Sequence, residues 1–412
     1  MNKVLWTPTP ERVEASTMAA FERFLRDKRG LTFADYNEMW DWSVTDLDGF
    51  WSAIWEFFNV EASAPFTTVM AKRQMPGAEW CPGAMLNFTD QIMKHVDRQP
   101  DGDALIVQSE TFGRKRLTWA QLRGQVSSVA AHLRDMGVAK GDRVVAVLPN
   151  TETAMIAFLA TASIGAIWSL CAPDMGHVAI LDRFKQIEPK VLIAQDGYVH
   201  AGKTVDRREI LAGLEAELPS LVQCITVPFV GELPKGHVAW DTLLDREVAY
   251  ESVQVPFDHP LWIVYSSGTT GNPKPIVHGH GGIILESAKQ SLHHDFKPGG
   301  RYCWLTSSGW IMWNSQFTAL GQGTTVAMFD GAPNYPDMGV IWRFVADEKL
   351  DFFGAGAAFF SGCMKAGVTP REDVDLSALK SLGSTGSPLS SDAYDWIYKD
   401  VKKDVWLAPI SG

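Results

Sequence analysis

From residue 262 to residue 274 the chain reads Trp-Ile-Val-Tyr-Ser-Ser-Gly-Thr-Thr-Gly-Asn-Pro-Lys. The first four residues are apolar or aromatic and predict a buried strand. The remaining nine predict a loop in which glycines let backbone N–H groups approach phosphate oxygens, hydroxyls donate hydrogen bonds, and Lys274 adds positive charge. Because Asn272 and Pro273 separate Gly271 from Lys274, the Walker A order is absent. The stretch therefore predicts a strand followed by a polyphosphate-binding loop of another type.

Strands and helices alternate on both sides of this loop. Before it, the apolar patterns predict strands at 104–107, 143–148 and 190–194, and helices at 118–136 and from 149 onward. After it, they predict a helix from about residue 282 and strands near 302–305, 325–329 and 352–355. Such alternation indicates βαβ units and mostly parallel sheets, so the predicted fold class is α/β.

The same patterns divide the chain into three segments. Residues 1–100 predict a helical N-terminal extension, in which 46–58 carries apolar residues at helical spacing. Residues 101–250 and 251–412 predict two consecutive α/β lobes, each with a mostly parallel sheet flanked by helices. At 405–412 a strand runs into a turn, so we expect the second lobe to be incomplete at its C-terminus.

The bulk composition is ordinary for a globular protein. The 412 residues are 46% hydrophobic and 21% charged, and the net charge of −11 gives no indication of nucleic acid or a membrane as partner. Five scattered cysteines without a CxxC pair, and an N-terminus lacking a signal peptide's apolar run, predict a cytoplasmic protein. No carboxylate or cysteine cluster accompanies His278, His280, His293 and His294, so no metal site is predicted.

The loop at 265–274 resembles the signature of the adenylate-forming superfamily, which includes acyl-CoA synthetases, luciferases and the adenylation domains of peptide synthetases. In that superfamily the loop holds the β- and γ-phosphates of ATP. The resemblance implies ATP-binding roles for the loop's hydroxyl, glycine and lysine residues, namely Ser266, Ser267, Gly268, Thr269, Thr270, Gly271 and Lys274. It also implies that Thr269 and Lys274 act in catalysis, where the loop serves the leaving pyrophosphate.

Residues 306–314 resemble the aromatic motif that lines the acid pocket of the superfamily. The resemblance implies that Trp310 forms a wall of this pocket and that Ile311 and Met312 form its floor. Asn314 is a candidate donor to a keto oxygen of the acid, since a buried carbonyl without a donor is costly. Without the resemblance, the segment also fits the end of a core strand.

Residues 384–388 resemble the next motif, in which the backbone lies against adenine. The resemblance implies that Gly386, Ser387 and Pro388 contact the base and that Thr385 faces the acid. Without it, the segment fits any turn rich in glycine and proline.

Other segments narrow the resemblance to one branch. Residues 329–337 resemble the corresponding segment of acetyl-CoA and acetoacetyl-CoA synthetases. Four more segments resemble those of the acetoacetyl-CoA synthetases in particular, at 5–8, 40–44, 80–87 and 182–190. Within the last of these, Arg183 is a candidate contact for the phosphates of coenzyme A. A solvated helix face is the alternative reading of Arg183.

The resemblance implies a two-step reaction of acetoacetate, ATP and coenzyme A, with Mg²⁺ on the phosphates. Acetate or propionate are neighbouring alternatives for the acid, and a nucleotide-binding fragment without catalysis is the alternative of another class. The family also uses a C-terminal domain that has no counterpart in these 412 residues. We therefore expect a truncated adenylate-forming large domain that is inactive, or nearly so, by itself.

Overall fold

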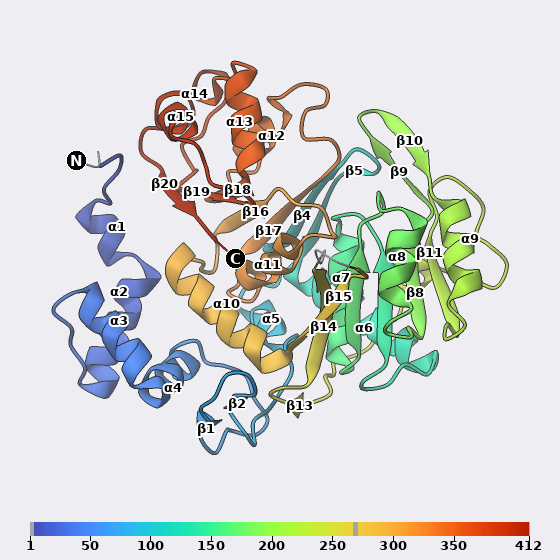
Figure 1. Cartoon of the computed structure of the whole chain (residues 1–412), viewed down its shortest axis with the longest axis horizontal. Coiled ribbons are helices and arrows are strands. Elements are labelled where there is room, and N and C mark those ends of the chain that lie inside the picture. Colours follow the sequence, from blue (N-terminus) through green and yellow to red (C-terminus); the bar gives the residue numbers. More distant parts are fainter. Residues whose placement is uncertain (1–3, 267–270, 412) are drawn as a thin grey trace.

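The computed structural model describes residues 4–266 and 271–411, and these residues form two seven-stranded sheets with helices packed around them (Figure 1). The chain is an α/β protein with mostly parallel sheets, as the sequence predicts. None of its described helices combines the length and the apolar character that crossing a membrane requires.

The first sheet has the order β12-β11-β8-β6-β7-β14-β15 and is parallel except for the antiparallel hairpin of β14 and β15 at one edge. Its strands are β12 Val238–Ala239, β11 Gln223–Val227, β8 Val191–Gln195, β6 Arg143–Val147, β7 Ile167–Cys171, β14 Pro260–Ser266 and β15 Lys274–Gly279. Helices α8 (His177–Phe184) and α9 (Arg208–Glu217) pack on the face to which Val145 and Val147 point. The alternate residues Val144 and Ala146 belong to the main core on the other face, as the two-residue period of a strand requires.

The second sheet has the order β20-β19-β18-β16-β17-β4-β5 and is parallel except for β4 and β5. Its strands are β20 Trp406–Pro409, β19 Ser381–Thr385, β18 Phe352–Gly356, β16 Arg301–Trp304, β17 Thr325–Asp330, β4 Asp103–Ser109 and β5 Gly113–Thr118. One face is covered by α12 (Val340–Asp347), α13 (Ala357–Lys365) and α15 (Ser391–Trp396), with the short α14 (Pro370–Asp373) nearby.

Two helices lie between the sheets and form the centre of the core. All twelve residues of α7 (Glu152–Ser163) are buried, and α7 contacts both β7 of the first sheet and β4 of the second. The rings of Phe158 on α7 and Phe317 on α11 (Ile311–Leu320) lie 4.5 Å apart in an edge-to-face arrangement. Aromatic pairs of this kind add to the burial of apolar area, so the two sheets share one core.

The N-terminal segment is mainly helical, as predicted. Its helices are α1 Pro10–Glu14, α2 Thr17–Phe24, α3 Tyr36–Thr45, α4 Leu47–Phe57 and α5 Asp90–Met93, and α2 and α4 contact α10 (His280–His294). Short strands interrupt it, with β1 (Met70–Lys72) pairing β2 (Glu79–Trp80) and β3 (Met85–Leu86) pairing β13 (Val255–Pro256).

The structure follows the predicted elements closely where the signal is local. The helix predicted at 118–136 corresponds to α6 (Trp119–Asp135), and Thr118 and Gln121 form a capping box at its start. The strands predicted at 143–148, 190–194 and 352–355 correspond to β6, β8 and β18.

The two sheets are not consecutive along the chain, and this differs from the predicted division at residue 250. Strands β4 and β5 precede that division but belong to the second sheet, where β4 pairs with β17. Strands β14 and β15 follow it but belong to the first sheet, where β14 pairs with β7. An apolar run predicts a strand but does not indicate which strand pairs with it. The exchange of strands between the two sheets could therefore not be predicted from local patterns.

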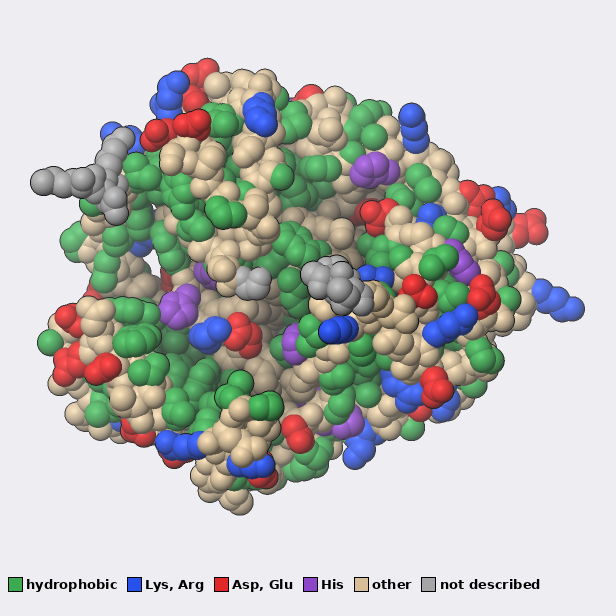
Figure 2. Space-filling view, viewed as in Figure 1, with side chains coloured by type: hydrophobic (Ala, Val, Ile, Leu, Met, Phe, Trp, Pro, Cys, Tyr) green, Lys and Arg blue, Asp and Glu red, His purple; other side chains and the backbone are tan. Residues whose placement is uncertain are grey.

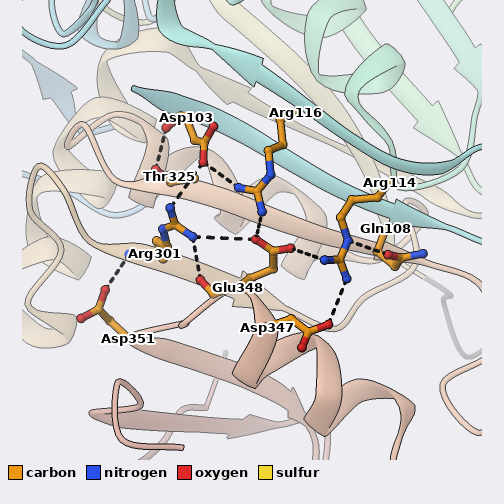
Figure 3. Close-up of polar contacts among 9 residues, drawn as sticks. All are labelled: Asp103, Gln108, Arg114, Arg116, Arg301, Thr325, Asp347, Glu348 and Asp351. Carbon is orange, nitrogen blue, oxygen red and sulfur yellow. Dashed lines mark hydrogen bonds and ion pairs between the residues drawn. The ribbon is translucent and has the colours of Figure 1, made fainter. Parts of the chain in front are cut away.

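A network of charged residues joins the second sheet to the end of α12 (Figure 3). The Glu348 carboxylate has no exposed surface and pairs with Arg114 Nη1 at 3.1 Å, with Arg301 Nη1 at 3.8 Å and with Arg116 Nη2. Asp103 accepts from Arg116 at 2.7 Å. Buried carboxylates are tolerated when they are paired in this way.

Candidate functional site

A cavity of about 480 Å³ opens between the two sheets. Residues that follow β6 and β7 of the first sheet, Asn150 and Ala172, line one side of it. Leu305 and Asp330, at the ends of β16 and β17, line the other. The surface is hollowed between these two parts of the molecule (Figure 2). Ligands of open α/β sheets bind at the carboxyl ends of the strands, so this cavity is the candidate site.

Side-chain hydrogen bonds join the two sheets beside the cavity. Gln316 Nε2 on α11 donates to Asn150 Oδ1 at 3.1 Å, and Ser308 Oγ donates to the Leu148 carbonyl at 2.5 Å. Both contacts connect a segment that follows β6 with a segment that follows β16. The cavity walls are therefore held at a fixed separation.

The predicted phosphate loop connects β14 to β15. Ser266 is the last residue of β14 and pairs with Lys274, the first residue of β15. Ser267, Gly268, Thr269 and Thr270 lie outside the described residues. Gly271 has a φ of +139°, which glycine adopts without the strain that a side chain would cause, and Lys274 is exposed. Because β14 is parallel to β7, this loop leaves the first sheet at the same edge as the cavity.

Helix α8 supports the base of the loop. The Tyr265 hydroxyl, one residue before Ser266, donates to the Arg183 carbonyl at 2.8 Å. Gln186 Nε2, just beyond the helix, donates to the Pro273 carbonyl at 2.9 Å. Both ends of the loop are thus held by α8 and the residues just after it.

Arg183 lies beside the hairpin. Its Nη1 donates to the Ala179 carbonyl at 2.5 Å, and its guanidinium lies over the Tyr265 ring with Cζ 5.6 Å from the ring centroid. One donor is therefore used within α8, and the guanidinium is held by a cation–π contact next to the phosphate loop.

The predicted acid and adenine motifs meet in space. Trp310 caps the start of α11 and lines the cavity. Gly386 follows β19 with a φ of +86°, and a Cβ at Gly386 would lie 3.7 Å from Cζ2 of the Trp310 indole. Ser387 and Pro388 continue the same turn and are exposed.

The remaining residues predicted for the acid pocket differ in their surroundings. Ile311 is 44% exposed, whereas Met312 and Asn314 are buried on α11 outside the cavity lining. Thr385 Oγ1 donates to the Ile410 carbonyl at 2.9 Å, which ties the end of β19 to the segment after β20.

The sequence patterns did not identify Asp330 as a site residue. Its carboxylate accepts from Ser109 Oγ at 2.7 Å at the cavity wall. Burial raises the pKa of Asp330 to about 6, the charges of Glu110 and Glu152 act in the same direction, and the Ser109 hydrogen bond opposes them. Asp330 belongs to the motif at 329–337, which indicates the branch of the family that the chain resembles but not the role of any single residue.

The histidines near the loop have structural partners. His278 Nδ1 accepts from Trp262 Nε1 at 2.7 Å, and His280 Nδ1 accepts from the Phe88 N–H at 3.0 Å. Burial lowers the pKa of His280 to about 3, so its ring is neutral. The Nδ1 atom of each histidine is therefore used in a structural hydrogen bond.

Two family models match the chain. Residues 92–408 match the model described as AMP-binding enzyme. Residues 36–92 match the model described as acetyl-coenzyme A synthetase N-terminus.

Individual proteins are similar over the whole chain. The acetoacetyl-coenzyme A synthetase of Rhizobium meliloti is 39% identical over 99% of this chain, and the acetoacetyl-CoA synthetase of Gallus gallus is 35% identical over 100% of it. The chain spans 63% of the length of each. The solved acetoacetyl-CoA synthetase of Streptomyces lividans is 43% identical, with a TM-score of 0.97 over 100% of this chain and 65% of that one.

Proposed function

Because the chain belongs to the AMP-binding enzyme family, we propose that it supplies the ATP- and acid-binding part of an acetoacetate–CoA ligase. In the first step the acetoacetate carboxylate attacks the α-phosphorus of ATP, forming acetoacetyl-AMP and releasing pyrophosphate. In the second step the thiolate of coenzyme A attacks the acyl carbon, and AMP leaves with the electron pair of the broken bond. The similarity to acetoacetyl-CoA synthetases along the whole chain supports acetoacetate as the acid.

The observation that carries the proposal is the meeting of three motifs at one edge. The loop between β14 and Lys274, the indole of Trp310 and the turn at Gly386 all follow the carboxyl ends of strands that have a parallel neighbour. A nucleotide that extends from the turn to the hairpin would present its α-phosphate near the cavity between the sheets.

The first step depends on positioning and charge rather than on an acid–base pair. Lys274 neutralises charge that moves onto the leaving pyrophosphate, together with the loop residues Ser266 to Gly271. Mg²⁺ supplies further charge neutralisation on the phosphate oxygens when ATP is bound. The backbone of Gly386, Ser387 and Pro388 contacts the adenine.

Acid recognition is assigned to α11 and β19. Trp310 forms the wall of the acid pocket, Ile311 and Met312 contribute around it, and Thr385 faces the acid. Asn314, buried on α11 four residues after Trp310, is the donor that we assign to the keto oxygen of acetoacetate, because a buried carbonyl without a donor is costly. A pocket built around such a donor discriminates against acids that lack the keto group.

The second step involves groups at the margin of the site and beyond this chain. Arg183 contacts a phosphate of coenzyme A, because its guanidinium lies at the base of the loop with donors beyond the one used by Ala179. As the family resemblance implies, a C-terminal domain of a longer protein would complete the site, and the chain spans 63% of the length of its relatives. A cytoplasmic location fits five cysteines that are all unpaired and buried.

The test is acid-dependent ATP–pyrophosphate exchange. It compares this chain with one extended to the length of its relatives, using acetoacetate, acetate, propionate and butyrate. We expect exchange in the extended protein, strongest with acetoacetate, and little or none in the 412-residue chain. Preference for acetate or propionate would reassign the substrate. Absence of exchange with every acid, while both proteins bind ATP, would replace catalysis with a nucleotide-binding role.

A further inference from the structure

Three side chains with metal-binding atoms meet at the far edge of the first sheet. They are Glu215 on α9, Cys224 on β11 and His237 just before β12. One ligand atom from each lies within 4.8 Å of the other two, and His237 Nε2 lies 3.0 Å from Glu215 Oε2. The three residues come from different elements, so the tertiary fold brings them together.

We propose that Glu215, Cys224 and His237 bind a divalent transition-metal ion, with Zn²⁺ as the best match. Zinc takes nitrogen, sulfur and carboxylate ligands in tetrahedral geometry, with bonds of about 2.0–2.3 Å that place ligand atoms about 3.5 Å apart. The separation of 3.0 Å between His237 Nε2 and Glu215 Oε2 and the upper limit of 4.8 Å for the cluster lie on either side of that spacing. A thiolate together with an imidazole disfavours Mg²⁺ and Ca²⁺, which prefer oxygen ligands.

The His237 ring is held by a second hydrogen bond. Its Nδ1 lies 2.7 Å from Thr226 Oγ1, and Thr226 is buried on β11. Without an ion, Nε2–H donates to the Glu215 carboxylate at 3.0 Å and Nδ1 accepts from the Thr226 hydroxyl. With an ion bound, the ring takes the other tautomer, in which Nδ1–H donates to the hydroxyl and the lone pair of Nε2 faces the ion. A partner on the second ring nitrogen is the arrangement that orients metal-binding histidines in proteins.

The loop that carries His237 is fixed at both ends. At its start, the Asp196 carboxylate accepts from the backbone N–H groups of Phe229, Val230 and Gly231 at 2.6–3.0 Å. At its end, Gln223 Nε2 donates to the Gly236 carbonyl at 2.9 Å. These contacts hold the ligand positions before any ion binds, which lowers the entropic cost of binding.

The surroundings leave one coordination position of the ion open to solvent. Cys224 is buried, whereas the Glu215 side chain is 48% exposed, so a water molecule can complete the tetrahedron from the solvent side. An ion here would fasten α9 to the β11–β12 edge. The proposal is independent of the ATP-dependent reaction, because none of these residues lines the cavity between the sheets.

The test is Co²⁺ and Zn²⁺ binding to the purified, chelator-treated chain. We expect one equivalent of Co²⁺ to give a thiolate-to-cobalt charge-transfer band that Zn²⁺ abolishes, and Zn²⁺ to raise the melting temperature. Cys224→Ser should remove the band. His237→Gln, which tests the site without altering the buried cysteine, should weaken binding strongly, and Glu215→Gln should do so as well. Thr226→Val should weaken binding about tenfold through the histidine.

Glu209→Gln is the matched control, because Glu209 is an exposed carboxylate on the same helix outside the cluster. It should leave the spectrum and the affinity unchanged. The proposal is wrong if the unsubstituted chain gives no charge-transfer band, if the band persists in Cys224→Ser, or if Glu209→Gln weakens binding as much as Glu215→Gln does.

Discussion

The indole of Trp310 lies beside Gly386, where an added Cβ would be 3.7 Å from the indole Cζ2, so the wall of the cavity and the turn after β19 are neighbours. Gly386 can have no side chain there without backbone strain, because its φ is +86°. The contact links the segment assigned to the acid with the segment assigned to the adenine.

Gly386→Ala should therefore weaken nucleotide binding. Strain at a positive φ costs on the order of 1–2 kcal/mol, and distortion of the turn should lower the affinity for AMP about tenfold, measured by calorimetry. Gly299→Ala is the control, since Gly299 has a φ of +81°, open space around it and a position before β16, away from the cavity. It should lower stability similarly and leave AMP affinity unchanged. Equal AMP affinity in both variants would show that Gly386 does not contribute to nucleotide binding.

Lys274→Ala should discriminate between nucleotides. Loss of a charged hydrogen bond to the β- or γ-phosphate costs about 1.5–3 kcal/mol, so ATP affinity should fall about 10- to 100-fold. AMP affinity should change little, because AMP lacks those phosphates. Lys289→Ala removes an exposed lysine that pairs with Glu286 on α10 and should change neither affinity. A parallel loss of AMP and ATP affinity in Lys274→Ala would contradict the assigned contact.

Arg183→Ala tests coenzyme A recognition in the extended protein. We expect a raised KM for coenzyme A and an unchanged rate of ATP–pyrophosphate exchange, because exchange does not involve coenzyme A. Lys185→Ala, one residue beyond α8 and paired with Glu217 at 3.0 Å, is the control and should leave both unchanged. Slower exchange in Arg183→Ala would show instead that the arginine supports the phosphate loop through Tyr265.

Glu348→Gln should destabilise the second sheet. The substitution leaves Arg114, Arg116 and Arg301 close together without their shared carboxylate, which costs on the order of 2–3 kcal/mol given that the arginines are partly exposed. Denaturant unfolding measures the loss. Asp347→Asn removes an exposed partner of Arg114 and should cost less than about 1 kcal/mol. Equal losses would mean that burial of Glu348 contributes nothing.

Asp330→Asn should change the pH dependence of stability. Since the folded pKa is about 6 and lies above the usual value of 3.8, the contribution of this group to stability is present at pH 4 and lost as pH rises through 6. The variant should match the wild type at pH 4 and be more stable at pH 7.5 by on the order of 2 kcal/mol. Unfolding at both pH values measures this difference.

Asp337→Asn should change the pH dependence of stability in the opposite direction. The Gly339 N–H and Arg343 hold the pKa of Asp337 below its usual range, so the carboxylate stabilises the fold above that range. The variant should lose stability relative to the wild type as pH rises from 3 to 7. A common trend in the two variants would point to a general effect of surface charge.

Local signals in the sequence predicted local structure well. The capping box of Thr118 and Gln121 was identifiable because both hydrogen bonds lie within four residues. Strand β15 was not predicted: its residues Pro275, Ile276 and Val277 are exposed at the sheet edge, so they show no alternation between buried and polar positions.

The candidate site was predictable in parts. Family resemblance pointed to Trp310 and Gly386, and the structure brings them into proximity. Asp330 required three-dimensional information, because its raised pKa comes from burial and from Glu110 and Glu152, which are distant in sequence. The cluster of Glu215, Cys224 and His237 could not be predicted from the sequence either, because its residues do not follow a short metal-binding spacing.

The exchange of strands between the sheets also affects how the chain is made. Thr325 Oγ1 donates to the Asp103 carbonyl across 222 positions of sequence, where β17 joins β4. At a translation rate of about 5–20 residues per second, β4 leaves the ribosome roughly 10–45 s before that neighbour exists. During this interval an apolar strand has one edge without a partner, and such edges promote aggregation. A chaperone therefore has the most apolar surface to cover while only the N-terminal half of the chain has left the ribosome.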